Sequence, residues 1–356
     1  MSDFRSDTVT RPSAAMKQAM LDAPLGDDVF GDDPTVNRLQ ALAAEMLGFE
    51  AGLFAPSGTQ TNLIALMTHC QRGDEAIVGQ QWHTYRWEGG GMAVLGSIQP
   101  QPLPHQEDGS IALADIEAAI KPDDPHFARS RLIVLENTTG GKVLPLTYMR
   151  EVAALAQRRG LQTHIDGARL MNAAVALSAE AGVAPLAMAQ DMCRGFDSLS
   201  LCLSKGLGAP IGSLLLGSRE FIGRARRARK MLGGGMRQAG LLAAAGIYAL
   251  ENNVTRLAED HANASALAQG LTRVAAEHKR LAGKLVTHAA QTNILFVDVD
   301  DDIADEFAAW LTANNMHATS GYYRVNQQPV KCFRWVTHLD IDRADIEHAL
   351  ATVARF

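Results

Sequence analysis

The sequence has few cysteines, no long hydrophobic run and no surplus of basic residues. Its 356 residues include only four cysteines, at 70, 193, 202 and 332, and no two of them form a CxxC pair. This spacing argues against zinc ribbons and redox dithiols, so we expect reduced cysteines in the core and no metal site. No uninterrupted apolar run reaches the ~18 residues of a membrane-spanning helix.

Positive charge is also in short supply. Lys and Arg number 33 against 39 Asp and Glu, which gives a formal net charge of −6. We therefore expect no nucleic-acid partner and no anionic membrane partner. The first residues, Met1 to Asp7, contain no apolar h-region, so no signal peptide is expected. Together these absences predict a soluble cytoplasmic protein.

The composition that is present is globular and rich in glycine. Hydrophobic residues make up 47% and charged residues 20%, which excludes disordered and low-complexity classes. The length predicts about two domains. Glycine accounts for 31 residues, about 9%, above the usual ~7%.

Short apolar runs alternate with helical patterns along the first 250 residues. Because buried parallel strands are continuous apolar runs, this alternation predicts an α/β domain with a mainly parallel sheet at residues 1–250. From about residue 250 the pattern changes to long amphipathic helices and a strand near 293–297, which predicts a smaller α+β domain at 251–356. The runs that we interpret as buried strands of the sheet are 76–78, 132–135, 163–165, 199–203 and 213–216.

A lysine and an aspartate each follow one of these predicted strands. Lys205 comes after the run 199–203 and before Gly206 and Gly208, and Asp166 ends the run at 163–165. Open α/β sheets bind ligands at the carboxyl ends of their strands, although a surface lysine at a strand end is the simpler alternative. Pyridoxal phosphate (PLP) requires this pair, a lysine for the Schiff base and a carboxylate for the pyridine nitrogen.

A third motif supplies an anion site. The turn Pro56-Ser57-Gly58-Thr59 enters a helical pattern, and free backbone N–H groups at a helix N-terminus bind phosphate. The turn alone predicts only a helix cap. A nucleotide-binding Rossmann fold is disfavoured because no GxGxxG follows the first strand.

Nearly the whole chain resembles a known family, the low-specificity L-threonine aldolases, which include the L-allo-threonine aldolases. These are PLP enzymes of fold type I, like aspartate aminotransferase, with a seven-stranded, mainly parallel sheet in the large domain. The motifs that carry the resemblance are Arg5-Ser6-Asp7-Thr8-Val9-Thr10, Gly26-Asp27-Asp28-Val29-Phe30-Gly31-Asp32-Asp33-Pro34, Leu135-Glu136-Asn137-Thr138, His164-Ile165-Asp166-Gly167-Ala168-Arg169, Leu203-Ser204-Lys205-Gly206-Leu207-Gly208 and Gly233-Gly234-Gly235-Met236-Arg237-Gln238.

The resemblance implies a role for the residues at matching positions. Lys205 would form the Schiff base, Asp166 would face the pyridine nitrogen, and His83 would stack on the cofactor ring. Arg169 would lie near both the phenolic oxygen of the cofactor and the substrate carboxylate. The phosphate would be held by Ser57, Gly58 and Thr59, with Lys230 and Arg237 contributed by a neighbouring subunit of a homotetramer built as a dimer of dimers.

The resemblance also implies substrate ligands. Ser6 and Arg334 would bind the carboxylate, with Arg324 as a competitor for the role of Arg334, and His126 would contact the side-chain hydroxyl. His126 follows an acidic turn, so an exposed loop histidine is the alternative. His83 and His126 are both candidates for the base that removes the β-hydroxyl proton, since a histidine pKa near 6.5 suits that task.

The implied reaction is reversible retro-aldol cleavage of L-threonine, L-allo-threonine and related β-hydroxy-α-amino acids to glycine and an aldehyde, acetaldehyde for threonine. Serine hydroxymethyl transfer, β-elimination and a non-catalytic PLP-binding role are the alternatives. The chain departs from the family at Thr139-Gly140, at Phe30, and in a longer segment at 321–331. These departures concern substrate preference.

Overall fold

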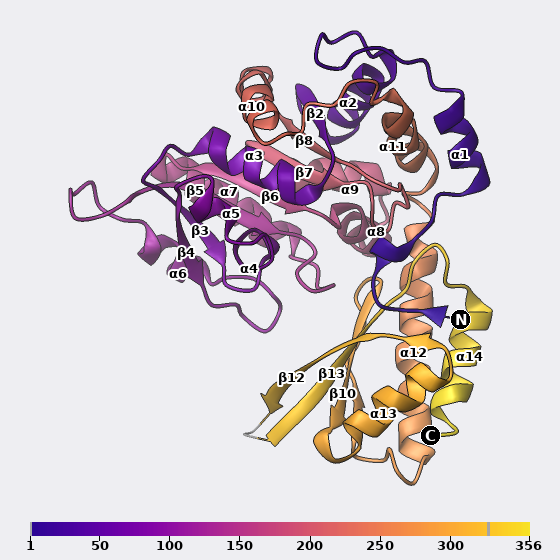
Figure 1. Cartoon of the computed structure of the whole chain (residues 1–356). Helices are drawn as coiled ribbons and strands as arrows, with labels where there is room; N and C mark the ends of the chain where they lie inside the picture. Colours follow the sequence, from indigo (N-terminus) through magenta and orange to yellow (C-terminus); the bar gives the residue numbers. More distant parts are fainter. Residues whose placement is uncertain (1, 326–327) are drawn as a thin grey trace. The chain divides into compact units, whose positions relative to one another are not determined.

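A computed structural model describes residues 2–325 and 328–356, without the side chains of 323–329. The chain divides into two compact units (Figure 1). The larger unit is Pro12–Val254, and the smaller unit joins Met1–Arg11 to Thr255–Phe356.

The larger unit is built on a seven-stranded sheet with the order β2-β8-β7-β6-β5-β3-β4. All neighbours from β7 to β4 pair in parallel, and β8 is antiparallel to both β2 and β7. The predicted α/β class with a mainly parallel seven-stranded sheet is confirmed. The strands are β2 (Ala51–Ala55), β3 (Asp74–Gly79), β4 (Gln99–Leu103), β5 (Arg129–Glu136), β6 (Gln162–Gly167), β7 (Ser198–Cys202) and β8 (Ser213–Gly217).

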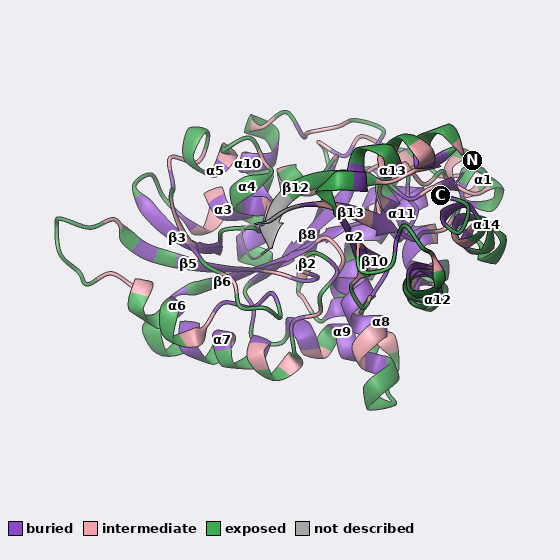
Figure 2. Cartoon of the chain, turned by 90° about the horizontal axis from the view of Figure 1, so that it is seen from below, coloured by how far each residue is buried: buried purple, intermediate pink, exposed green. Residues whose placement is uncertain are grey.

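The central strands are apolar because helices cover the sheet. β3, β7 and β8 are buried along their whole length, and Figure 2 shows much of the sheet in the purple of buried residues. This burial explains the apolar runs at 76–78 in β3 and 214–216 in β8, whereas β7 alternates serine with leucine although it is buried on both faces. The helices of this unit are α1 (Ala14–Leu21), α2 (Pro34–Leu47), α3 (Gly58–His69), α4 (His83–Arg86), α5 (Gly91–Val94), α6 (Leu113–Ala119), α7 (Leu146–Arg159), α8 (Leu170–Ala181), α9 (Pro185–Cys193), α10 (Arg219–Met231) and α11 (Gly240–Asn252).

The smaller unit contains an antiparallel sheet with the order β12-β13-β10-β9 and a two-stranded parallel pair, β1 with β11. Phe4, Phe307, Phe333 and Trp335 are fully or almost fully buried in its core. Its elements are β1 (Ser2–Asp3), the 3-10 helix η1 (Asp7–Val9), α12 (Leu257–Glu277), β9 (Leu285–Thr287), β10 (Ile294–Asp300), α13 (Asp301–Ala313), β11 (Met316–His317), β12 (Thr319–Val325), β13 (Gln328–Val336) and α14 (Arg343–Val353).

The N-terminal segment belongs to the smaller unit, which differs from the expected assignment of residues 1–250 to one domain. β1 pairs with β11, and the ring of Phe4 lies 5.2 Å from that of Trp335. Burying Phe4 there removes a large apolar surface from water, which ties the first residues to the C-terminal part of the chain. The division near residue 250 falls at Val254/Thr255, just after α11.

Among the described residues, no single helix is long and apolar enough to cross a membrane. Taken together, α8 and α9 are long and apolar enough, but the chain bends by 114° between them.

Candidate active site at the carboxyl edge of the sheet

Asp166 is the second-last residue of β6, and Lys205 lies just beyond the carboxyl end of the neighbouring parallel strand β7. The backbone turns sharply after Lys205, whose carbonyl oxygen accepts a hydrogen bond of 2.8 Å from the N–H of Gly208. Gly208 has a φ of +76°, a conformation that favours glycine. The predicted placement of the lysine and the aspartate at one sheet edge therefore rests on two parallel strands and a glycine turn.

Asp166 is 2% exposed and has partners on both carboxylate oxygens. Its Oδ1 accepts a hydrogen bond of 3.0 Å from the N–H of Ala168, and its Oδ2 accepts one of 2.8 Å from Nδ2 of Asn62 on α3. A carboxylate oxygen can accept more than one hydrogen bond, so Asp166 has capacity left for a further donor. A protonated ring nitrogen is a donor of that kind.

His83, the first residue of α4, forms a pair with Glu88. Nδ1 of His83 lies 2.8 Å from Oε1 of Glu88, and Nδ2 of Asn62 donates to the same oxygen at 2.8 Å. The hydrogen bond to Glu88 raises the pKa of His83, and burial raises the pKa of Glu88. His83, Glu88 and Asp166 each place one nitrogen or carboxylate oxygen within 4.8 Å of the others.

Glu136 ends β5 and pairs in the sheet with Asp166. Its Oε2 accepts a hydrogen bond of 2.5 Å from the backbone N–H of His83, which fixes the start of α4. Burial, together with the charge of Asp166, raises the pKa of Glu136. The positive charge of Lys205 opposes the rise in the pKa of Glu136 and the rise in the pKa of His83. The lysine therefore belongs to the same electrostatic group.

The predicted phosphate turn is the start of α3. Oγ of Ser57 caps this helix by accepting a hydrogen bond of 3.2 Å from the N–H of Gln60. Gly58 and Thr59 form its first two positions, before the first intrahelical bond from Thr61 to Ser57. Oγ of Ser213 is buried with no hydrogen-bond partner among the described residues, and a Cβ on Gly58 would lie 3.5 Å from it. These donors fit a phosphate group at the helix end.

The glycine motif 233–235 packs against the same turn. A Cβ on Gly234 would lie 2.1 Å from Oε1 of Gln60, and Nε2 of Gln60 donates to the carbonyl of Leu232 at 3.1 Å. A side chain at position 234 would therefore displace the side chain of Gln60 from this position. Within the chain, Nη1 of Arg237 pairs with Oδ2 of Asp27 at 3.0 Å, and exposed Lys230 lies in the last turn of α10.

Arg169 follows β6 directly and is the N-cap residue of α8. It therefore lies at the same sheet edge as Asp166. The side chain of Arg324 lies outside the described residues.

Within this chain the loop of His126 lies at the amino end of β5, at the other edge of the sheet, and its expected contact with the substrate hydroxyl stays a prediction. It precedes β5 (Arg129–Glu136), whose eight residues separate its loop by about 25 Å from Glu136. Its side chain is 85% exposed, and Nδ1 lies 2.7 Å from Oδ1 of Asp124. The acidic turn holds an exposed loop histidine, and His83 is the histidine at the site.

Ser6 and Arg334 come together within the smaller unit. Nη2 of Arg334, on β13, donates to the carbonyl of Arg5 at 3.0 Å. Oγ of Ser6 accepts hydrogen bonds from the N–H and the hydroxyl of Thr8, at 3.2 and 2.9 Å. The expected pair of carboxylate ligands is thus adjacent, although 328 residues separate the two in sequence.

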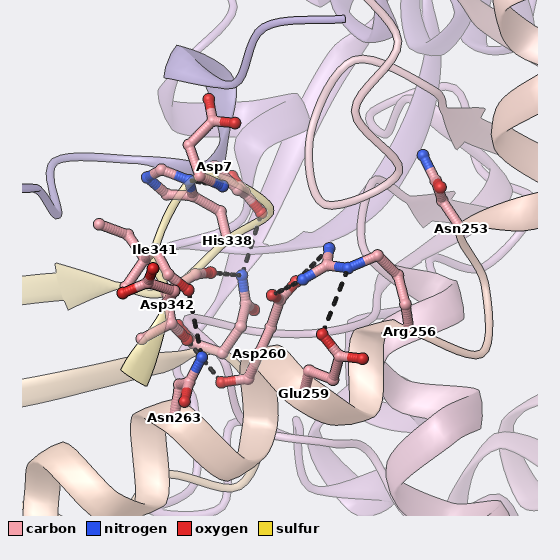
Figure 3. Close-up of polar contacts among 12 residues, drawn as sticks. Asp7, Asn253, Arg256, Glu259, Asp260, Asn263, His338, Ile341 and Asp342 are labelled. Atoms are coloured by element: carbon pink, nitrogen blue, oxygen red, sulfur yellow. Dashed lines mark hydrogen bonds and ion pairs between the residues drawn. The ribbon is translucent and has the colours of Figure 1, made fainter. Parts of the chain in front are cut away.

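A buried polar network anchors the segment that carries Ser6. Oδ2 of Asp7 accepts a hydrogen bond of 3.2 Å from Asn293, whose amide also donates to the carbonyl of Thr337. The hydroxyl of Thr337 donates to the carbonyl of Asp260 at 2.6 Å, and Arg256 pairs with the Asp260 carboxylate (Figure 3). Burial raises the pKa of Asp260 to about 6.

One of the departures from the family, at Thr139, has a visible consequence in the structure. The hydroxyl of Thr139 accepts a hydrogen bond of 2.9 Å from Nε1 of Trp82 and donates to the carbonyl of Glu136 at 2.9 Å. Thr139 therefore ties the loop before His83 to the end of β5. Phe30 is 77% exposed, and nothing within the chain explains its choice.

Sequence reasoning missed three residues of this site: Asn62, Glu88 and Glu136. Asn62 closes the motif that begins at Ser57, and Glu136 lies in a motif quoted for the resemblance. Their contacts join separate elements, so no spacing along the chain gives them.

Comparison with known proteins agrees with this geometry. A family model described as beta-eliminating lyase matches residues 3–302. The low specificity L-threonine aldolase of Escherichia coli K12 is 50% identical over 351 residues, which cover 99% of this chain and 98% of that protein. The chain belongs to the low-specificity L-threonine aldolases, within the beta-eliminating lyase family.

Solved structures of lower identity share the fold. A threonine aldolase from Leishmania major superposes with a TM-score of 0.82 at 21% identity, over 100% of this chain and 99% of that chain. A serine palmitoyltransferase from S. paucimobilis with a bound PLP–myriocin aldimine has a TM-score of 0.71 at 17% identity, over 100% and 86% of the two chains. Fold type I is therefore established for this chain.

Proposed function

We propose that this protein cleaves L-threonine, L-allo-threonine and related β-hydroxy-α-amino acids to glycine and an aldehyde, with PLP as cofactor. The observation that carries the proposal is the meeting of Lys205, Asp166 and the N-terminus of α3 at one sheet edge. The names of the relatives support the same reaction.

The residues present fit PLP. Ser57, Gly58 and Thr59 offer donors to a phosphate, Asp166 has acceptor capacity for a ring nitrogen, and Lys205 can bond to an aldehyde carbon. When bound, PLP supplies an electron sink for the carbanion left by carbon–carbon cleavage. Asp166 stabilises the positive ring nitrogen on which that sink depends.

His83 is the proposed base for the β-hydroxyl proton. Glu88 is the acceptor facing Nδ1, so the neutral ring carries its proton on Nδ1 and keeps the lone pair on Nε2. Nε2 can then accept the hydroxyl proton, and Glu88 stabilises the imidazolium that results. Because its ring is also proposed to cover the cofactor, His83 has both a binding and a catalytic role.

Ser6, Arg169 and Arg334 are the proposed ligands of the substrate carboxylate. The planar guanidinium of arginine matches a carboxylate with two parallel hydrogen bonds. Fixing the carboxylate orients the bond to be broken, and such positioning contributes several kcal/mol to catalysis, roughly.

The assembly and location are further parts of the proposal. We propose a homotetramer in which Lys230 and Arg237 reach the phosphate of a neighbouring subunit, and a location in the cytoplasm. The mildly acidic composition and the resemblance of the glycine motif at 233–235 support these two statements.

The second candidate is β-elimination, which the name of the matching family model favours. It would release ammonia and a keto acid in place of glycine and an aldehyde.

The test is aldehyde release from L-threonine, L-allo-threonine and phenylserine by the PLP-loaded protein, with ammonia measured in parallel. We expect aldehyde and glycine in equal amounts from the wild type and loss of both in Lys205→Ala. Lys279→Ala, an exposed lysine outside the site, is the matched control and should retain activity. PLP binding without aldehyde from any substrate, or ammonia with a keto acid, would contradict the proposal.

A further inference from the structure

A chain of polar side chains leads from His69, at the end of α3, through β7 and β6 to Asn62 on α3 and from there to Asp166. Nε2 of His69 lies 2.7 Å from Oγ of Ser198, and the same Oγ lies 2.8 Å from Nδ1 of His164. Nε2 of His164 lies 3.2 Å from Oδ1 of Asn62, whose Nδ2 donates to Asp166. Asn62, His164 and Ser198 are each at most 3% exposed.

The carboxylates fix the direction of these hydrogen bonds. Carboxylates only accept, so the two protons on Nδ2 of Asn62 go to Asp166 and Glu88. Oδ1 of Asn62 must therefore accept, and Nε2 of His164 must donate to it. A neutral His164 then accepts on Nδ1, so the hydroxyl of Ser198 donates to it and His69 donates to Ser198.

The histidines are in an environment that keeps them neutral. Burial lowers the pKa of both His164 and His69 to about 3. His69 also faces the positive charge of Arg224, which acts in the same direction, and its ring stacks on Phe221 with centroids 4.4 Å apart. Nε2–H of His164 is therefore a fixed donor over the working range of pH.

We propose that His164, Ser198 and His69 are positioning residues that act through Asn62 to hold the carboxylate of Asp166 in the orientation that faces the cofactor. Every donor in the chain points toward the carboxylates, and each hydrogen bond polarises the next. The amide of Asn62 serves Asp166 and Glu88 together, so one donor chain stabilises both the cofactor-facing carboxylate and the partner of His83. This inference rests on the proposed role of Asp166 toward PLP.

The charged and titratable groups around Asp166 make such a device necessary. Glu88 and Glu136 bring two further carboxyl groups close to it, and both have a pKa raised by burial and by the charge of Asp166. His83 and Lys205 provide the opposing positive charge. The donors on Asn62 offset the repulsion of Glu88 and Glu136 and hold the carboxylate of Asp166 in place.

The test compares PLP dissociation constants of three variants in the full-length protein. His164→Leu removes the donor, and we expect the dissociation constant to rise about tenfold or more. His164→Gln keeps an amide donor toward Asn62 and should stay within about threefold of the wild type. Thr163→Val is the matched control. Thr163 lies on β6 beside His164, and its hydroxyl donates a hydrogen bond to Asp197 that is not part of the donor chain.

Two readouts separate positioning from a structural role. The absorbance of bound PLP should titrate at a shifted pH in His164→Leu and at the wild-type pH in Thr163→Val. The proposal would be overturned if His164→Leu unfolds at a lower midpoint but binds PLP with the wild-type affinity and shows the wild-type pH titration. That outcome leaves aldehyde release by the wild type intact, so it is distinct from a failure of the proposed function.

If His164→Leu does not fold, the tautomer of His164 is measured by nitrogen NMR of the wild-type apoprotein with labelled histidine. We expect His164 to be the neutral Nε2–H tautomer from pH 5 to 8. An Nδ1–H tautomer, or a charged ring at pH 6, would overturn the proposal.

Discussion

The two regions that carry the proposed ligands of cofactor and substrate are held in different ways. At the sheet edge of the larger unit, Asp166, Asn62, Glu88 and His83 bond to one another through their side chains. In the smaller unit, Arg334 is held by a backbone carbonyl, that of Arg5. The first region joins titratable side chains to one another, and the second holds its arginine through the main chain.

This difference predicts that variants of the two regions fail in different ways. A change in the larger unit should alter the binding of PLP and the pH dependence of the reaction. A change at Ser6 or Arg334 should alter the Michaelis constant for the amino acid and leave the affinity for PLP unchanged.

Asp166→Asn should have the largest effect. The variant removes a buried charge that the positive ring nitrogen needs, so we expect aldehyde release to fall at least about 10²-fold. The dissociation constant of PLP should rise as well. Steady-state kinetics and a fluorescence titration with PLP measure the two effects, and full activity at saturating PLP would break the comparison.

Arg334→Gln should raise KM for L-threonine by about 10- to 100-fold, because a hydrogen-bonded charge partner of the carboxylate is lost. The affinity for PLP should not change. Arg334→Lys keeps the charge without the planar fork and should recover only part of the loss. A change in PLP affinity equal to that of Asp166→Asn would show that the two regions are not separable.

Each unit also contains a histidine kept neutral by burial, His164 in the larger and His261 in the smaller. Burial lowers the pKa of His261 to about 4 from an unfolded value of about 6.5. Because the pKa of His261 is lower in the folded protein than in the unfolded chain, its effect on the free energy of unfolding depends on pH. The free energy of unfolding is undiminished above pH 6.5 and falls as the pH drops toward 4.

His261→Gln should therefore unfold with a weaker dependence on acid. Between pH 7 and pH 4.5 we expect it to lose about 2 kcal/mol less free energy of unfolding than the wild type. Denaturant melts at the two pH values measure this difference. An acid dependence equal to that of the wild type would show that His261 is charged in the folded protein.

Glu88→Gln gives the smallest expected effect, a shift in a pH profile. Glu88 raises the pKa of His83, and the proposed base must be neutral to accept a proton. The variant should move the acid limb of kcat/KM to lower pH. Glu45→Gln, an exposed residue on α2, is the control and should leave the limb in place. An acid limb unmoved by Glu88→Gln would exclude His83 as the titrating base.

The sequence predicted the residues that lie at the ends of recognisable strands and helices. Asp166, Lys205 and the turn at Ser57 follow from the rule that parallel strands present their carboxyl ends at one edge. Asn62 and Glu88 could not be predicted in this way, because α3 and the bend after α4 bring them to Asp166 only after packing.

Two segments lie where the sequence alone did not place them. The loop of His126 precedes β5, and the contact of this histidine with the substrate hydroxyl stays a prediction. The N-terminal segment joins the smaller unit through two-residue strands and the burial of Phe4. Pairing over so short a stretch leaves no periodic pattern in the sequence.

The most direct test of the site at the sheet edge is peptide mapping after reduction. The protein is incubated with PLP, reduced with sodium borohydride, digested and analysed by mass spectrometry. We predict the mass of the reduced cofactor on the peptide that contains Lys205, and no such adduct without reduction. An adduct on another lysine, or none on Lys205 in protein that binds PLP, would contradict the account.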